Sequence, residues 1–374
     1  MRLLIAPDKF KGSLTALAAA EAIERGFRSV IPGVQADLAP IADGGEGFTE
    51  ALAAALNAEW ITVVAEDAVS RAIEARYAWV ESEKLAVIEM SAASGLWHFK
   101  LDERNPLAAT TYGTGLLLKD ALARGARKVL LGLGGSATTD GGAGIAKALG
   151  YKFLNEAGGD FFPHPGNLDL LDSIEAPPGL ALPEIIAACD VQNPLLGERG
   201  TARVYSPQKG ADAREVEILE SGMRRLADAA QAMLGKDFRN VPGAGAAGGL
   251  GFGLLAFCGA SIRPGFDLIA ETMRLDERLA AADLVITGEG RLDDQTLDGK
   301  GPAGVAERAR KAGKPVIAIG GAVTPAAEQA GIFTAMLPIV DRPLPLEEAM
   351  KDAALLLERA AARAARLLQI TLRS

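Results

Sequence analysis

Cysteine and histidine are scarce in this sequence, and their scarcity excludes several kinds of chemistry. The 374 residues include two cysteines and two histidines, at Cys189, Cys258, His98 and His164. With no CxxC pair and no closely spaced set of cysteines, the sequence carries no disulfide framework. The histidines lie far apart along the chain and form no HExxH motif, so neither a zinc hydrolase nor a histidine-based serine triad is indicated.

Long apolar runs and basic charge are lacking too. No uncharged apolar run reaches the roughly 18 residues that a membrane-spanning helix needs, and the N-terminus lacks the apolar stretch of a signal peptide. The formal net charge is −9 and the isoelectric point is near 5.1, whereas a nucleic-acid-binding surface is basic. We therefore expect a cytoplasmic protein with no nucleic-acid partner and no membrane partner.

Two nucleotide-binding signatures are missing as well. The sequence has neither the GxxxxGK[ST] loop of P-loop NTPases nor the HRD and DFG motifs of protein kinases. Hydrophobic residues make up 49% of the chain and glycine is abundant, with 43 residues, while aromatic residues make up only 5%. This composition indicates a large core of closely packed helices and strands, and the length suits two domains.

The pattern of apolar segments changes twice along the chain. Residues 2–56 alternate between strand and helix patterns, with Ser13 as the predicted N-cap of the first helix. Residues 60–110 contain strands joined by short links, which indicates antiparallel pairing. The alternation resumes after about residue 264. We predict one discontinuous α/β domain, residues 1–59 plus 264–374, and one inserted mixed α/β domain, residues 60–263.

Three local patterns leave room for different outcomes. The glycine-rich residues 242–251 form either a linker or the start of a helix. An apolar stripe from Ala349 to Leu367 predicts one final helix. Asp43 and Glu46 could form a capping box at a helix start, and the same carboxylates would also suit Mg²⁺.

Four apolar, strand-like runs end in loops of glycines and carboxylates, and a helical pattern follows each. These loops lie at residues 8–13, 43–47, 132–142 and 287–293. Open α/β sheets bind ligands beyond the carboxyl ends of their strands, and glycine lets backbone N–H groups approach a phosphate. Carboxylates in the same loops would repel phosphate unless a metal ion or lysines neutralise them. The loops together therefore predict a site for a metal ion and a nucleotide.

The third loop also fits a dinucleotide-binding fingerprint, and this leaves alternatives open. Residues 132–137 match GxGxx(G/A) between a strand and a helix. The fingerprint requires an acidic residue about 20 positions later, where only Glu156 is available and lies slightly too far along. Residues 138–142 also lengthen the turn, so we interpret the loop as binding the phosphates of a mononucleotide. An NAD-dependent hydroxy-acid reductase and a non-catalytic two-domain ligand-binding protein are the alternatives.

Several long motifs resemble one known family. Residues 7–14, 42–47, 134–142, 189–195 and 287–293 closely resemble the signature segments of the bacterial glycerate kinase family, type I, in order and spacing. Lys9 stands at a position where that family often has serine. The resemblance implies two α/β domains, one flavodoxin-like and one resembling a restriction-enzyme fold, with the active site in the cleft between them. It implies ATP-dependent phosphorylation of D-glycerate with Mg²⁺, mostly to 2-phosphoglycerate, although 3-phosphoglycerate is also assigned in the family.

For this reaction we assign candidate roles to residues of the loops. Phosphoryl transfer requires positioning and charge neutralisation, so cations should hold the glycerate carboxylate while carboxylates bind the metal or take the hydroxyl proton. The catalytic candidates are Lys9, Lys11, Asp43, Asp190, Arg291, Asp293 and Lys300. The nucleotide-binding candidates are Gly134, Gly135, Ser136, Thr138, Thr139 and Asp140. The substrate-binding candidates are Asp8, Ser13, Gly44, Gly45 and Arg71, and the metal-binding candidates are Asp43, Asp190 and Glu289. The identity of the base, the hydroxyl that is phosphorylated, and the choice between monomer and homodimer stay open.

Overall fold

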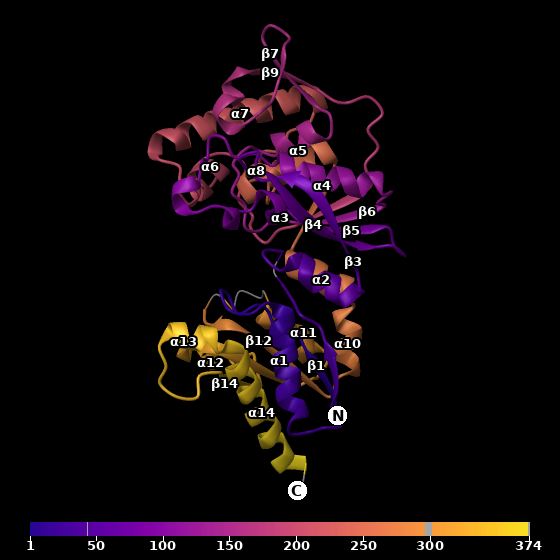
Figure 1. Ribbon diagram of the computed structural model, residues 1–374, viewed down its shortest axis with the longest axis vertical. Helices are drawn as coiled ribbons and strands as arrows, with labels where there is room; N and C mark the ends of the chain where they lie inside the picture. The colour runs from indigo at the N-terminus through magenta and orange to yellow at the C-terminus, as the bar shows by residue number, and fades with distance from the viewer. Residues whose placement is uncertain (43, 295, 297–300, 373–374) are drawn as a thin grey trace. The chain divides into compact units, whose positions relative to one another are not determined.

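A computed structural model describes residues 1–372 except 43, 295 and 297–300, and the chain divides into two compact units (Figure 1). Unit 1 comprises Met1–Asp43, Glu50–Asn57 and Phe266–Ser374, and unit 2 comprises Gly44–Thr49 and Ala58–Gly265. The predicted domain boundaries and the predicted cleft stay predictions. In the described part of the chain, no helix has both the length and the apolar composition needed to cross a membrane.

Unit 1 is built on a parallel sheet. Its strands are β1 (Arg2–Ile5), β2 (Gln35–Leu38), β12 (Leu284–Leu292), β13 (Val316–Val323) and β14 (Ala335–Pro338). Their order in space is β14-β13-β12-β1-β2, and every neighbouring pair is parallel. Counted within the unit, this is the strand order 2-1-3-4-5 of flavodoxin-like folds. The predicted flavodoxin-like class is therefore confirmed.

The strand order of unit 1 reverses between β1 and β12. Leu3 to Ile5 pair with Leu284 to Ile286, and beyond them the Asp8 N–H donates to the Gly288 carbonyl at 2.8 Å. The residues that follow these two strands therefore lie next to each other. In open α/β sheets, ligands bind at such a switch point.

Helices and loops bury both faces of this sheet. The helices are α1 (Ala16–Arg28), α10 (Leu275–Ala281), α11 (Pro302–Lys311), α12 (Pro325–Gln329), α13 (Leu346–Lys351) and α14 (Ala353–Leu372), with parts of α2 (Phe48–Leu56) and α9 (Gly265–Thr272). Leu3 and Ile5 pack in one core with α1 and α14, and Leu4, which points to the opposite face, is equally buried. Helices α1 and α14 lie side by side (Figure 1), and a Cβ atom at Gly26 would come 2.3 Å from the Glu358 carbonyl oxygen.

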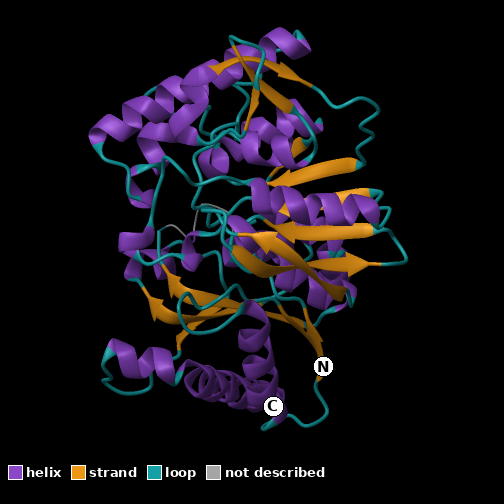
Figure 2. Ribbon diagram, turned by 45° about the horizontal axis from the view of Figure 1, so that its top comes forward, coloured by secondary structure: helices purple, strands orange, loops and turns teal. Residues whose placement is uncertain are grey.

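Unit 2 contains a mixed sheet and a smaller antiparallel one (Figure 2). The mixed sheet has β3 (Glu59–Glu66), β4 (Ala72–Val80), β5 (Leu85–Glu89), β6 (Lys128–Gly132), β10 (Glu184–Ala188) and β11 (Ser261–Arg263), in the order β11-β10-β6-β5-β4-β3. The small sheet joins β7 (Lys152–Asn155), β8 (Asp160–Phe161) and β9 (Leu171–Glu175). Strands β3, β4 and β5 pair antiparallel, as predicted, and β5, β6, β10 and β11 are parallel. The predicted mixed α/β class is confirmed, while the likeness to a restriction-enzyme fold stays a prediction.

The glycine-rich segment before β11 is the start of a helix and not a linker. The helices of unit 2 are α3 (Ser91–Ser94), α4 (Tyr112–Ala123), α5 (Ala143–Ala148), α6 (Thr201–Tyr205), α7 (Ala213–Leu234) and α8 (Ala246–Cys258). Near the start of α8, residues 247–249 have left-handed backbone angles. A Cβ atom at Gly248 would lie 1.8 Å from the Thr138 carbonyl oxygen, and one at Gly253 would lie 2.6 Å from that of Gly141. Glycine therefore lets α8 pack directly against the loop after β6.

Two helix predictions are wrong in detail. Thr15, not Ser13, caps α1: its Oγ1 accepts a hydrogen bond from the Ala18 N–H at 3.2 Å. The single predicted C-terminal helix is two helices, because the chain leaves helical geometry at Asp352.

One strand extends beyond its predicted end. The strand that begins at Leu284 was expected to end near Thr287, but β12 continues to Leu292 because β13 pairs with it as far as Val323. Glu289 and Arg291 consequently lie on a strand and not in a loop.

The contact between α1 and α14 should not tolerate a side chain at position 26. Replacing Gly26 with leucine places atoms against backbone, so the free energy of unfolding should fall by about 1–3 kcal/mol in urea titrations. Gly33→Leu is the matched control, since a Cβ atom there meets nothing within 4 Å. Equal stability of the two variants would contradict the packing described here.

Candidate functional site

Three neighbouring parallel strands of unit 2 end at the same level. Glu89 at the end of β5 pairs in register with Gly132 at the end of β6, and Gly132 pairs with Ala188 at the end of β10. Residues 133–142, here called the glycine loop, follow β6, and Asp190 follows β10. Glu89, the glycine loop and Asp190 therefore share one edge of the sheet, the edge where α/β sheets bind ligands.

The segment Gly44–Thr49 packs against the glycine loop. The Gly134 N–H donates to the Gly44 carbonyl at 3.3 Å. A Cβ atom at Gly134 would lie only 2.2 Å from the Gly45 Cα atom, so this position requires glycine. Gly44 has a positive φ of 84° and lies against Ala188. The structure thus brings together the predicted residues Gly44, Gly45 and Gly134.

Glu89 provides the cap at the start of α2. Its Oε2 atom accepts from the N–H groups of Gly47 at 3.2 Å and Thr49 at 3.4 Å, and its Oε1 atom accepts from the Ser91 hydroxyl at 2.8 Å. A carboxylate is favourable at a helix N-terminus. The sequence had assigned this cap to Asp43 and Glu46, but Asp43 lies outside the described residues and these contacts belong to Glu89.

Asp140 is fully buried and holds the glycine loop in shape. Its carboxylate accepts five hydrogen bonds, from Thr110 Oγ1, Thr111 N, Thr111 Oγ1, Gly142 N and Gly144 N, at 2.7–3.2 Å. These donors satisfy the carboxylate and occupy N–H groups at the start of α5. The structure therefore gives Asp140 an anchoring role in place of the predicted contact with a nucleotide.

The part of the loop that a ligand could reach is its first half. Gly135 is exposed with a φ of 73°, Gly134 is half-buried, and Ser136 is 9% exposed. Thr138 and Thr139 have no exposed surface, yet the Thr138 hydroxyl has no hydrogen-bond partner among the described residues. Because an unsatisfied buried hydroxyl is costly, this atom offers a position for a polar ligand atom.

Lys209 lies behind the glycine loop and was missed by the sequence reasoning. It ends the 3-10 helix Pro207–Lys209 and is 2% exposed. Its Nζ atom donates to Ser136 Oγ at 2.7 Å and to the Thr138 carbonyl at 2.6 Å. Burial lowers the pKa of Lys209 to about 7, and Asp140 opposes that lowering.

In unit 1, several predicted residues gather at the carboxyl ends of β1 and β12. Asp8 is 8% exposed and follows β1. The Thr296 hydroxyl donates to Glu289 Oε1 at 2.7 Å and accepts from the Asp293 N–H at 3.0 Å. Arg291 Nε forms an ion pair with Asp293 Oδ2 at 2.9 Å. The switch point of the sheet thus carries carboxylates beside an exposed guanidinium.

The remaining candidates of the first loop lie in the turn after β1. The Lys9 N–H donates to the carboxylate of Asp8 at 2.6 Å, and Lys11 is exposed. The Ser13 hydroxyl donates to the Phe10 carbonyl at 2.9 Å and so closes the turn. The candidates Asp43 and Lys300 lie outside the described residues.

Arg71 already has anionic partners. Its guanidinium pairs with Asp67, which is 1% exposed, and with Glu103 at 3.6 Å, and it lies 4.9 Å from the centre of the Phe99 ring. Two carboxylates more than balance its single charge. Arg71 therefore stabilises the turn between β3 and β4, and its predicted role as the partner of a substrate carboxylate loses its physical basis.

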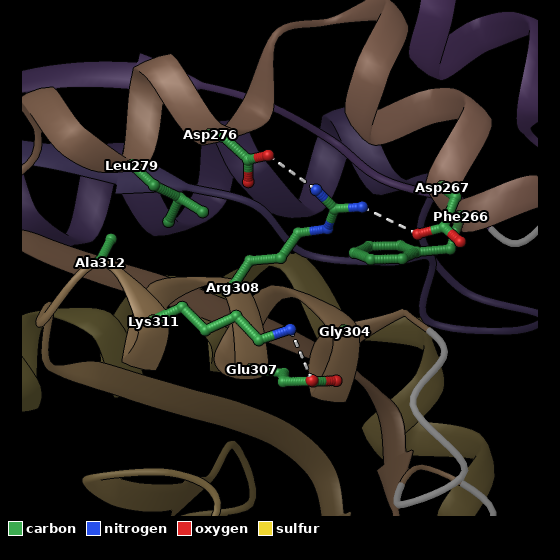
Figure 3. A pocket seen from close by; sticks show the side chains of 9 residues that line it. All are labelled: Phe266, Asp267, Asp276, Leu279, Gly304, Glu307, Arg308, Lys311 and Ala312. Atoms are coloured by element: carbon green, nitrogen blue, oxygen red, sulfur yellow. Dashed lines mark hydrogen bonds and ion pairs between the residues drawn. The ribbon is translucent and has the colours of Figure 1, made fainter.

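A hollow of about 490 Å³ in unit 1 lies between α9, α10 and α11 (Figure 3). Figure 3 shows the Arg308 guanidinium between Asp276 and Asp267, at 2.9 and 2.8 Å, and Lys311 pairs with a neighbouring glutamate. None of the predicted site residues lines this hollow. Because its cations are already paired, it does not offer charge to an anionic ligand.

The fold and these strand ends define an α/β protein with a glycine loop and carboxylates arranged for phosphate chemistry. A model of the glycerate kinase family matches residues 3–369. Glycerate kinases of Halalkalibacterium halodurans and Bacillus subtilis are 46% and 45% identical, with 96% of each chain covered. Glycerate 2-kinase of Escherichia coli is 42% identical over 87% of this chain and 86% of its own. A crystal structure assigned as glycerate kinase 2 from Salmonella typhimurium LT2 matches both chains in full, with a TM-score of 0.90 and 39% identity.

The chain belongs to the glycerate kinase family. The predicted resemblance is confirmed, and so is the predicted enzyme class, a phosphotransferase with an alcohol group as acceptor. Nothing in these comparisons supports the alternatives of an NAD-dependent reductase or a non-catalytic binding protein.

Replacing Asp140 with asparagine should loosen the glycine loop. An amide keeps one acceptor oxygen but points its own N–H groups at donors, so the free energy of unfolding should fall by about 1–3 kcal/mol or more. Asp102→Asn, at an exposed position of unit 2, should be neutral. Urea unfolding of both variants checks this, and a neutral Asp140→Asn would contradict the anchoring role.

Proposed function

We propose that this protein transfers the γ-phosphoryl group of ATP to D-glycerate, and that the main product is 2-phosphoglycerate. The family membership supports the reaction, and the name of the Escherichia coli relative, glycerate 2-kinase, supports the choice of hydroxyl. The observation in this chain that carries the proposal is the glycine loop at the carboxyl edge of the unit 2 sheet.

The ATP phosphates bind the first half of this loop. Gly134 and Gly135 let the phosphates approach the backbone, and the Ser136 hydroxyl is a hydrogen-bond donor at the same place. The Thr138 hydroxyl, which is buried and has no partner in the described part of the chain, fits a polar group in this position. Thr139 and Asp140 support the loop from behind without contacting the nucleotide.

A magnesium ion fits the carboxylates that are available. Asp190 and Glu289 would hold it, together with Asp43, which lies outside the described residues. The described residues contain no group of three or more potential metal ligands, and Mg²⁺ is usually held by only one or two carboxylates and by substrate phosphates. When bound, the ion supplies positive charge to the phosphate oxygens.

The side chains of this protein then orient glycerate and accept one proton. Lys9 and Lys11 hold the glycerate carboxylate by charge. As the C2 hydroxyl oxygen bonds to the γ-phosphorus and the bond to ADP breaks, the hydroxyl proton passes to a carboxylate, for which Asp190 and Asp293 are the described candidates. Arg291 neutralises charge on the transferring group.

The remaining finer assignments are proposals of the same kind. The partner is a small molecule, D-glycerate, and the location is the cytoplasm. The domain boundaries are those predicted after residue 59 and before residue 264, and the choice between monomer and homodimer stays open.

The reaction can be tested directly. Purified protein with ATP, Mg²⁺ and D-glycerate should release ADP in a coupled assay, and ³¹P NMR should identify 2-phosphoglycerate as the main product. No ADP release above that of a sample without glycerate would reject the proposed activity. A signal from 3-phosphoglycerate alone would reject only the choice of hydroxyl.

Asp190→Asn tests the proposed acid–base or metal role. The amide oxygen can still accept from the Gly265 N–H, which lies 3.1 Å from Asp190 Oδ1, so the fold should survive. The loss of a catalytic carboxylate should lower kcat by about 100-fold or more. Asp172→Asn, at an exposed position on β9, is the matched control. Unchanged turnover in Asp190→Asn would remove this residue from the mechanism.

A further inference from the structure

Lys209 is a buried cation whose hydrogen-bond partners are uncharged. Lysine is almost never fully buried without a paired charge, yet its Nζ atom donates to a hydroxyl, Ser136 Oγ, and to a carbonyl, that of Thr138. Both partners belong to the glycine loop. Gly210, with a φ of 102°, turns the chain directly after Lys209. The protein therefore bears the cost of burying an amine at the back of this one loop.

The contact with Ser136 fixes the direction of a hydroxyl proton. An ammonium group has donors only, so Ser136 Oγ must accept the hydrogen bond from Lys209. The Ser136 O–H is then left to donate elsewhere. Beside it lies Gly135, which is exposed, so a phosphate oxygen held at the first half of the loop could accept this proton.

Few charges compete with Lys209 near the loop. Asp140, in the loop itself, favours the charged form of the amine. Arg104 donates to the carbonyl of Gln208, the residue before Lys209. On α6, which packs against the 3-10 helix, Arg203 is paired with Glu217 at 2.8 Å. A phosphate at the loop would be a second anion near the amine, and in a buried setting charges act more strongly than in water.

We propose that Lys209 is a positioning residue for the nucleotide: it holds the glycine loop from behind, orients the Ser136 hydroxyl toward the phosphates, and supplies positive charge through the loop. This inference rests on the proposed binding of ATP phosphates at that loop. Lys209 itself does not touch the substrate.

Proton uptake distinguishes this role from a purely structural one. Since the pKa of Lys209 lies near 7 without nucleotide, the amine is mostly neutral at pH 8. A bound anion raises this pKa, so binding should draw a proton from solution. Calorimetric titration of the full chain with the ATP analogue AMP-PNP and Mg²⁺ at pH 8, in two buffers of different ionisation enthalpy, measures that uptake.

Lys209→Met removes the charge while keeping most of the stem. It should abolish the proton uptake and raise the KM for ATP by about tenfold or more, while the KM for D-glycerate changes by less than about threefold. Lys147→Met, which removes a partly buried lysine paired with Asp160 in the same unit, is the matched control and should behave as the unaltered protein does. Because Lys209 acts through Ser136, the effects of Lys209→Met and Ser136→Ala on the KM for ATP should be less than additive in the double variant.

The outcomes separate this inference from the proposed function. A folded Lys209→Met variant with unchanged KM for ATP and unchanged proton uptake would overturn the inference and leave the kinase activity standing. If that variant does not fold, the unaltered protein decides: uptake at pH 8 supports the role of Lys209, and binding without uptake overturns it. If the unaltered protein binds no AMP-PNP and phosphorylates no glycerate, the proposed function fails, and this inference fails with it.

Discussion

The buried carboxylate of Asp140 is the contact on which the shape of the glycine loop depends. It gathers donors from the start of α5 and from Thr110 and Thr111, about thirty positions earlier in the chain. A carboxylate without exposed surface is stable only when such donors satisfy it. With the loop anchored in this way, its first half can stay open to a ligand while Lys209 and α8 support its second half from behind.

Both units place their chemistry according to the same rule of sheet geometry. In unit 1 the strand order reverses between β1 and β12, and Asp8 and Glu289 lie at that reversal. In unit 2 the parallel strands β5, β6 and β10 end together, which aligns Glu89, the glycine loop and Asp190. Parallel strands bring residues that are remote in sequence to one edge, so each unit gathers polar groups without any long sequence motif.

The sequence predicted what depends on local pattern and missed what depends on tertiary partners. The strand–glycine–carboxylate junctions at Asp8, Gly134 and Asp190 are local, and they were found. Glu89 follows an apolar strand in the same way and could have been found by the same signal. Lys209 could not, because its partner Ser136 lies 73 positions away and its burial depends on packing. The extent of β12 likewise depends on its partner β13, which no pattern within β12 reveals.

The strand pairing of unit 1 has a consequence for how the chain is made. Strand β1 is central in its sheet, yet its partner β12 begins only at Leu284. On the ribosome, residues 1–43 must therefore wait until nearly all of unit 2 has emerged before their sheet can close. Domains generally fold as units during synthesis, so the second unit in the chain can acquire its structure first. The N-terminal strand, although translated earliest, is among the last segments to find its place.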